Sequence, residues 1–223
     1  MIEIWHIDAA AEADRLAPYE AVLTAAERDG IARFRQPEDR LLRTVARGAL
    51  RLLLGRRTGT APEALVFEEG PQGKLALAGG PHFNLSHCRG QGLIGIGDRP
   101  LGVDVEREDR TVDWRGLCRM VAAPREVEAI EAAPEHDRAR LFMSLWTAKE
   151  SYVKALGIGI GHPLREVQVI GPGGTLPTVL DTSQPRDARE PWRLHPLASP
   201  PGYLSCLCHP GPAAPVREQA FRA

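Results

Sequence analysis

The chain has 223 residues, of which 43% are apolar and 26% charged, and its formal net charge at pH 7 is −1. This length is enough for a buried core, as one larger domain or two smaller ones, and the composition is that of a soluble globular protein. A chain this close to neutrality is not expected to coat a polyanion, so nucleic acid is not a predicted partner.

The first residues, MIEIWHIDAA, carry Glu3, His6 and Asp8 where a secretion signal would need an unbroken apolar run. Later segments are too short or too polar to span a bilayer. We therefore expect a cytoplasmic protein with no membrane partner. Apolar and polar residues alternate in MIEIWHI, which predicts a first strand.

Two helices are predicted in the first half of the chain. Thr24 and Glu27 match a capping box, in which each side chain bonds the other residue's backbone N–H, and would start a short helix. In the segment 37–59 the leucines fall on one face of a longer helix, which Gly55 would end. The opposite face forms an arginine ridge, either solvated or facing an anionic partner, made of Arg40, Arg43, Arg47 and Arg51.

Short elements follow in the rest of the chain. The turn at 98–100 is taken as the midpoint, which divides the chain into halves 1–100 and 101–223. Two helices are expected in the second half, at 124–133 and from about 137 to 156. The tail 209–223 is expected to be loose. Strands are predicted around 64–77 as a pair, 92–98, 102–106, 165–170, 191–197 and 202–208.

The strand GVDVE sets two carboxylates, Asp104 and Glu106, among apolar neighbours. Side chains alternate along a strand, so Val103 and Val105 point one way and the two carboxylates point the other, about 7 Å apart. Like charges this close oppose each other's ionisation unless water or a cation lies between them. The pattern indicates either a metal site or a solvated strand end.

The helix WTAKESYVKALG places Glu150 and Lys154 four residues apart, on one face. They are either a surface ion pair or part of a site. In the second case Glu150 completes a Mg²⁺ shell with the two strand carboxylates, and Lys154 lies beside a phosphate that the metal holds.

Few lysines occur in this arginine-rich chain. Of 28 basic residues only Lys74, Lys149 and Lys154 are lysine. These lysines could mark positions where a compact ammonium is needed and a planar guanidinium would clash. Chance retention is the alternative explanation. Ser86 and His87, expected in a loop, could contact a phosphate, although a lone histidine is more often a hydrogen-bonded structural residue.

In order along the chain, G-K, F-N-x-S-H, GVDVE and W-x-x-K-E-S-x-x-K resemble the 4′-phosphopantetheinyl transferases of the surfactin-synthetase-activating type, from about Ile31 to Pro163. The resemblance implies an α+β fold of two similarly folded halves, related by a pseudo-two-fold axis, with the active site in the cleft between them. It also implies a monomer.

The resemblance implies transfer of the phosphopantetheine arm of coenzyme A to a serine of an apo acyl or peptidyl carrier protein, with Mg²⁺, releasing adenosine 3′,5′-bisphosphate. Glu150 and Lys154 would be catalytic, and either Glu150 or a water held by the metal would be the base. Glu126 matches an acidic position of the family. Another Mg²⁺-dependent nucleotide hydrolase and an inactive carrier-protein binder are the alternatives. The implied metal ligands are Asp104, Glu106 and Glu150, and the implied coenzyme A contacts are Arg43, Arg47, Lys74, Ser86, His87 and Lys154.

Overall fold

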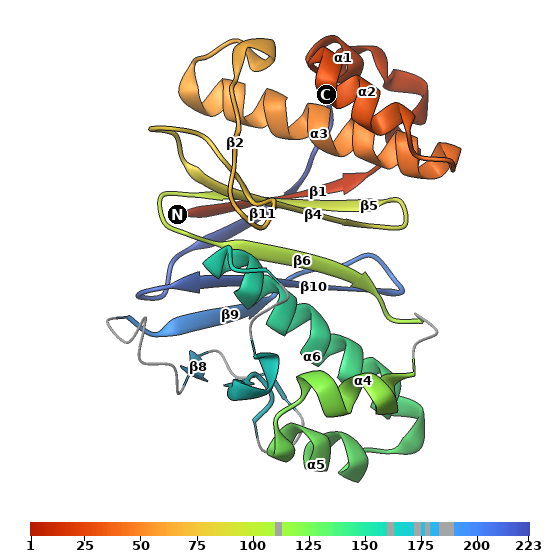
Figure 1. The fold of residues 1–223 in the computed structure, drawn as a ribbon, viewed down its shortest axis with the longest axis vertical. Helices are drawn as coiled ribbons and strands as arrows, with labels where there is room; N and C mark the ends of the chain where they lie inside the picture. The colour runs from red at the N-terminus through yellow and green to blue at the C-terminus, as the bar shows by residue number, and fades with distance from the viewer. Residues whose placement is uncertain (110–112, 160–162, 172–174, 177–178, 183–189) are drawn as a thin grey trace. The chain divides into compact units, whose positions relative to one another are not determined.

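The computed structural model describes residues 1–109, 113–159, 163–171, 175–176, 179–182 and 190–223. It separates into two compact units, of which unit 1 contains Met1–Asp98 and Val216–Ala223, and unit 2 contains Arg99–Pro215. In each unit a long helix packs against a β-sheet (Figure 1). This architecture confirms the predicted α+β class, whereas the similar folding of the two halves about a pseudo-two-fold axis stays a prediction.

In unit 1 the sheet has the order β11-β1-β5-β4, in which β1 pairs antiparallel with β5 and parallel with β11. The predicted first strand is therefore confirmed at the centre of this sheet. The strands are β1 (Ile2–Asp8), β2 (Glu68–Glu69), β3 (Leu75–Ala76), β4 (His82–Cys88), β5 (Gln91–Gly97) and β11 (Val216–Ala220). The helices are α1 (Ala17–Ala21), α2 (Ala25–Ala32) and α3 (Pro37–Thr58), with 3₁₀ turns at Ala10–Arg15 and Pro62–Ala64.

The helix ends in unit 1 follow local chemistry. The predicted capping box is present: the Glu27 N–H donates to the Thr24 hydroxyl, and the Thr24 N–H donates to the Glu27 carboxylate. The expected stop at Gly55 is wrong, because α3 continues to Thr58 and ends at Gly59, which has a φ of 70°. Gly55 instead packs tightly, since a Cβ there would lie 2.9 Å from Cγ of Pro62.

Unit 2 has a sheet of the order β6-β10-β9-β8-β7, with antiparallel neighbours, and α6 packs against β6 and β10. The two predicted helices are present as α5 and α6, whereas α4 was not anticipated. The helices are α4 (Trp114–Val121), α5 (Pro124–Ala132) and α6 (Glu135–Leu156), with a 3₁₀ turn at Leu164–Glu166. The strands are β6 (Gly102–Arg107), β7 (Val167–Gln168), β8 (Val179–Thr182), β9 (Trp192–Pro196) and β10 (Tyr203–Pro210).

The tail from residue 209 is not loose, contrary to expectation. It completes β10 and then forms β11 beside β1, and Phe221 is 3% exposed with its ring 6.0 Å from that of Trp5. The short polar sequence of β11 carries little apolar alternation, so only its long-range pairing with β1 reveals it. Helices in the described ranges are not long and apolar enough to cross a membrane.

Candidate active site

Asp104 and Glu106 lie on β6, on the face that packs against α6. Gly102 marks this face, because a Cβ added there would collide with the α6 backbone at Ser151 and Ala155. Alternation places Asp104 and Glu106 on the same side as Gly102. Glycine at this position therefore lets the helix approach the strand closely and brings α6 side chains onto the two carboxylates.

From α6, Glu150 faces this strand. Its side chain is only 8% exposed, and within the described part of the chain its Oε1 is buried and accepts no hydrogen bond. Burial and then the negative charges of Asp104 and Glu106 raise the pKa of Glu150, and the positive charge of Lys154 only partly opposes them. The three carboxylates thus repel one another, an arrangement that a cation would stabilise.

Lys154 supplies one such cation from the same helix. Its Nζ lies 2.5 Å from Oδ1 of Asp104, which is 3% exposed. The i,i+4 spacing with Glu150 suggested a pair within the helix, whereas this ion pair joins the helix to the strand.

These residues suit Mg²⁺ because their side chains offer carboxylate oxygens as ligands. Carboxylate oxygens are preferred Mg²⁺ ligands, and among the described residues Oε1 of Glu150 is a buried oxygen that still lacks a hydrogen-bond partner. In the residues that can be described, however, His, Cys, Asp and Glu side chains form no group of three or more able to hold a metal ion as they stand. A cation bound to Asp104 would compete with Lys154 for its oxygen.

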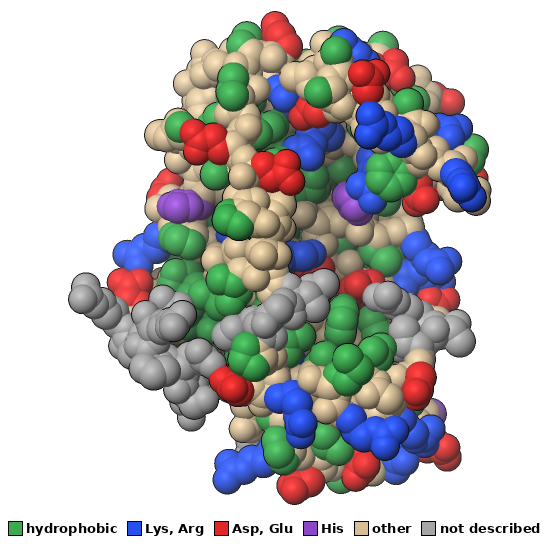
Figure 2. Space-filling view, viewed as in Figure 1, with side chains coloured by type: hydrophobic (Ala, Val, Ile, Leu, Met, Phe, Trp, Pro, Cys, Tyr) green, Lys and Arg blue, Asp and Glu red, His purple; other side chains and the backbone are tan. Residues whose placement is uncertain are grey.

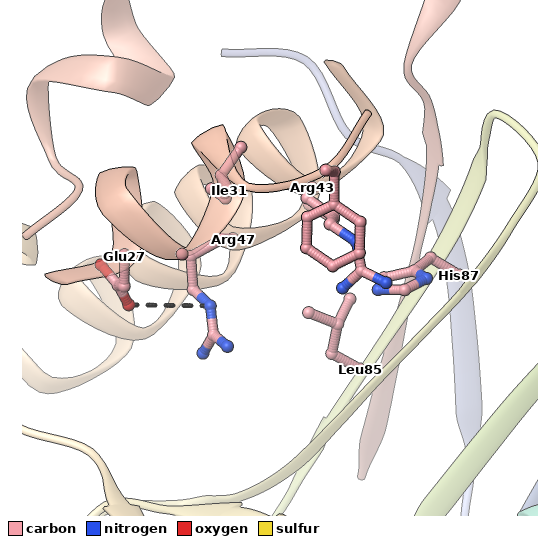
Figure 3. Close-up of a pocket in the computed structure, with 9 residues that line it drawn as sticks. Glu27, Ile31, Arg43, Arg47, Leu85 and His87 are labelled. Carbon is pink, nitrogen blue, oxygen red and sulfur yellow. Dashed lines mark ion pairs between the residues drawn. The ribbon is translucent and has the colours of Figure 1, made fainter. Parts of the chain in front are cut away.

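A second cluster, in unit 1, forms a pocket of about 240 Å³ between α2, α3 and β4 (Figure 3). Its polar lining is mainly basic, and basic side chains also gather over the helices of unit 1 on the face shown in Figure 2. Such a pocket suits an anionic ligand. Its lining is Glu27, Gly30, Ile31, Phe34, Arg43, Ala46, Arg47, Leu85 and His87.

Two arginines of the ridge point into this pocket. The guanidinium of Arg43 stacks on Phe34, 3.7 Å from the ring centroid. Arg47 lies 3.6 Å from Glu27 and extends from α3 into the pocket (Figure 3). Both guanidinium groups are partly exposed and are placed to meet a phosphate.

Arg51 has a different environment from the rest of the ridge, and the expectation of a single exposed face is wrong. Its side chain is 3% exposed and bonds both Glu27 oxygens, at 2.8 and 3.0 Å, and the carbonyls of Pro62 and Leu65. Burial opposes the ionisation of Glu27, but hydrogen bonds from Arg51 and the Thr24 backbone lower its pKa overall. Arg51 is therefore a structural residue that holds α2 and the segment after α3 against α3.

Ser86 and His87 belong to β4 and not to a loop, because FNLSH pairs with β5 along its length. Leu85 and His87 line the unit 1 pocket, whereas Ser86, on the opposite face of the strand, is buried and lies outside it. Lys74 lies between β2 and β3, also outside this pocket, and burial lowers its pKa to about 8.

Sequence reasoning gave no role to a buried pair of charged residues in unit 2. Lys149 and Glu126 are 1% and 0% exposed, and Lys149 Nζ lies 2.6 Å from Glu126 Oε2. The signal was the presence of a lysine in an arginine-rich chain, one residue before Glu150. The predicted residues thus form two groups: Arg43, Arg47 and His87 in unit 1, and Asp104, Glu106, Glu150 and Lys154 in unit 2.

Known proteins are similar in sequence to this chain. Residues 100–208 match the sequence model of the 4′-phosphopantetheinyl transferase superfamily. The 4′-phosphopantetheinyl transferase HetI of Nostoc is 32% identical over 75% of this chain and 73% of its own length. The Synechocystis protein slr0495 is 36% identical over 67% of this chain, and the match spans 63% of slr0495.

Similarity to solved structures is weaker. Thermotoga maritima holo-[acyl-carrier-protein] synthase covers 50% of this chain and 62% of its own, with 19% identity and a TM-score of 0.39. The assignment therefore stands on the sequence matches, which agree with the motifs in β4, β6 and α6. The chain belongs to the 4′-phosphopantetheinyl transferase superfamily.

Proposed function

We propose that this protein transfers the 4′-phosphopantetheine arm of coenzyme A to a serine of an apo acyl or peptidyl carrier protein and releases adenosine 3′,5′-bisphosphate. The observation that carries the proposal is the packing of α6 on β6, which gathers Asp104, Glu150 and Lys154 in a chain of this superfamily. A buried acidic site beside a lysine suits chemistry on a pyrophosphate.

Asp104, Glu106 and Glu150 are the residues that would hold Mg²⁺. When bound, the metal would supply positive charge that stabilises the pyrophosphate as its bond breaks. Burial is the largest cause of the raised pKa of Glu150, and the repulsion from Asp104 and Glu106 that adds to it is what favours a cation here.

The remaining steps fall to side chains of this chain. The carrier serine oxygen would attack the β-phosphorus, and the bond from that phosphorus to the bridging oxygen of the bisphosphate would break. Either Glu150 or a water held in the carboxylate site would take the serine proton. Lys154 would balance the charge that develops on the phosphates.

We assign the unit 1 pocket to the 3′-phosphate of coenzyme A. Two guanidinium groups and an imidazole, from Arg43, Arg47 and His87, give it the donors that a phosphate needs. By their motifs, Lys74 and Ser86 would bind other phosphate oxygens.

We further propose that the protein is a cytoplasmic monomer. Sedimentation equilibrium would then report a mass near 24.4 kDa.

Release of adenosine 3′,5′-bisphosphate tests this function. Chromatography of reactions with coenzyme A and Mg²⁺ should show the bisphosphate only when an apo carrier protein is present, and Glu150→Gln should abolish it. Release without a carrier would support the nucleotide hydrolase instead. No release with any apo carrier of a broad panel would support the carrier-protein binder.

A further inference from the structure

The turn of α6 that carries Glu150 also carries one partner of a buried ion pair. Lys149 immediately precedes Glu150 on α6, and its ammonium lies 2.6 Å from Glu126, with both side chains at most 1% exposed. A charge so deeply buried is tolerated only when it is paired and hydrogen-bonded. The polar atoms of both side chains are bonded to partners within the chain, so the pair acts through what it holds in place.

Lys149 uses its ammonium to tie α6 to two other segments. Besides Glu126, it donates to the carbonyl of Val121 at 2.7 Å and to that of Leu164 at 2.8 Å. These three acceptors match the three donors of an ammonium group. The end of α4 and the 3₁₀ turn after α6 are thereby fixed to the turn of α6 that carries Glu150.

Glu126 completes the connection from α5. Its Oε2 accepts from the backbone N–H of Ala123 at 2.8 Å, and its Oε1 accepts from those of Val169 and Ile170 at 2.5 and 3.1 Å. The carboxylate thus caps the start of α5 and also holds the chain after β7. Apart from this cap, the hydrogen bonds in the network join different segments of unit 2.

We propose that the Lys149–Glu126 pair is the positioning element of the carboxylate site. Successive residues of an α-helix point about 100° apart, so an anchor at Lys149 fixes the rotation of α6 and hence the direction of Glu150. Gly102 sets the distance between helix and strand, and the ion pair sets the rotation. The inference rests on the proposed role of Asp104, Glu106 and Glu150.

Two variants separate positioning from general stability. Lys149→Met leaves the Glu126 carboxylate buried without its cation, which is strongly destabilising, whereas replacing both partners of a buried pair is often nearly neutral. The double variant Lys149→Met/Glu126→Gln should therefore melt well above the single variant. Phe142→Leu is the matched control, because Phe142 is 1% exposed in the same core and makes apolar contacts there.

The readout is the affinity for Mn²⁺, used as a probe and followed by electron paramagnetic resonance on the full chain. We expect the double variant to bind Mn²⁺ about 10- to 100-fold more weakly than wild type, the usual loss when a group that orients a ligand is removed. Its affinity for adenosine 3′,5′-bisphosphate should not change. Phe142→Leu should lose melting temperature but keep its Mn²⁺ affinity.

Wild-type Mn²⁺ affinity in the double variant would overturn the inference while leaving the proposed function intact. An equal loss of affinity in Phe142→Leu would also overturn it, since general destabilisation would then suffice. If wild type binds no Mn²⁺, or if Asp104→Asn binds it as wild type does, the proposed metal site itself is wrong and the inference fails with it.

Discussion

Lys154 shares the Asp104 carboxylate with any cation that the site binds, because its Nζ lies 2.5 Å from Oδ1. Lys154→Met should therefore bind Mn²⁺ more tightly than wild type in the absence of coenzyme A, since a competing cation is gone. It should nevertheless transfer the arm about 100-fold more slowly, because the charge on the phosphates is no longer balanced. Mn²⁺ titration and steady-state kinetics measure the two effects.

Arg140→Met is the control, because it removes another cation of α6, one that pairs with Glu108 and is 62% exposed. This variant should change neither the affinity for Mn²⁺ nor the rate of transfer, because an exposed ion pair contributes little free energy. Weaker Mn²⁺ binding in Lys154→Met would contradict the competition and show that the ammonium supports the site.

Burial lowers the pKa of Lys74 from 10.5 to about 8, so the folded chain gives up this proton more readily than the unfolded chain. Between these pH values the unfolded state binds more protons, and the free energy of unfolding must rise with pH. Below about pH 8 Lys74 is protonated in both states, so the stability gained at high pH is lost. In Lys74→Met this rise should be absent, so the wild type should gain on the variant from pH 8 to 10.5. Urea titrations across that range check the sign; parallel curves would contradict it.

At the scale of elements, the contact of α6 with β6 depends on one glycine. A Cβ at position 102 would collide with the backbone of α6 at Ser151 and Ala155, and backbone cannot move aside as a side chain can. We predict that Gly102→Ala lowers the free energy of unfolding by about 1–3 kcal/mol or more. Gly30→Ala is the control: a Cβ there has open space, so a small gain in stability is expected. Unchanged stability of Gly102→Ala in urea would refute the close approach.

The arginine ridge of α3 divides into structural and ligand-facing residues. Arg51→Ala should lower the free energy of unfolding by about 3 kcal/mol, because it leaves Glu27 without its buried partner. Arg43→Ala should keep the melting temperature and weaken adenosine 3′,5′-bisphosphate binding about tenfold, the loss of one charged hydrogen bond. Thermal melts and calorimetric titration separate the two. Weaker binding with unchanged stability in Arg51→Ala would reverse the assignment.

For the molecule as a whole, the sequence predicted what local chemistry decides. Three such features are the Thr24–Glu27 capping box, the long helix of unit 1 and the GVDVE strand. Each depends on residues that are close together along the chain. The residues proposed for the site came from the family resemblance, which short motifs along the chain were enough to show.

The features that were missed depend on contacts between distant segments. Arg51 is buried by Glu27 and by the loop at Pro62, which no periodicity on α3 can reveal. The strand β11 exists through its parallel pairing with β1, at the other end of the chain. Lys149 and Glu126 were noticed as residue types, but their partnership requires the fold of unit 2.

The intact mass of an apo carrier protein, measured after incubation with this protein, coenzyme A and Mg²⁺, tests the central claim most directly. The account predicts that the carrier gains the mass of one phosphopantetheinyl group, located on a serine. It predicts no gain with Asp104→Ala or Glu150→Gln, although both variants should stay folded, because removing a carboxylate relieves repulsion in the site. Modification of the carrier at the wild-type rate by Asp104→Ala, in the presence of a chelator, would contradict the account.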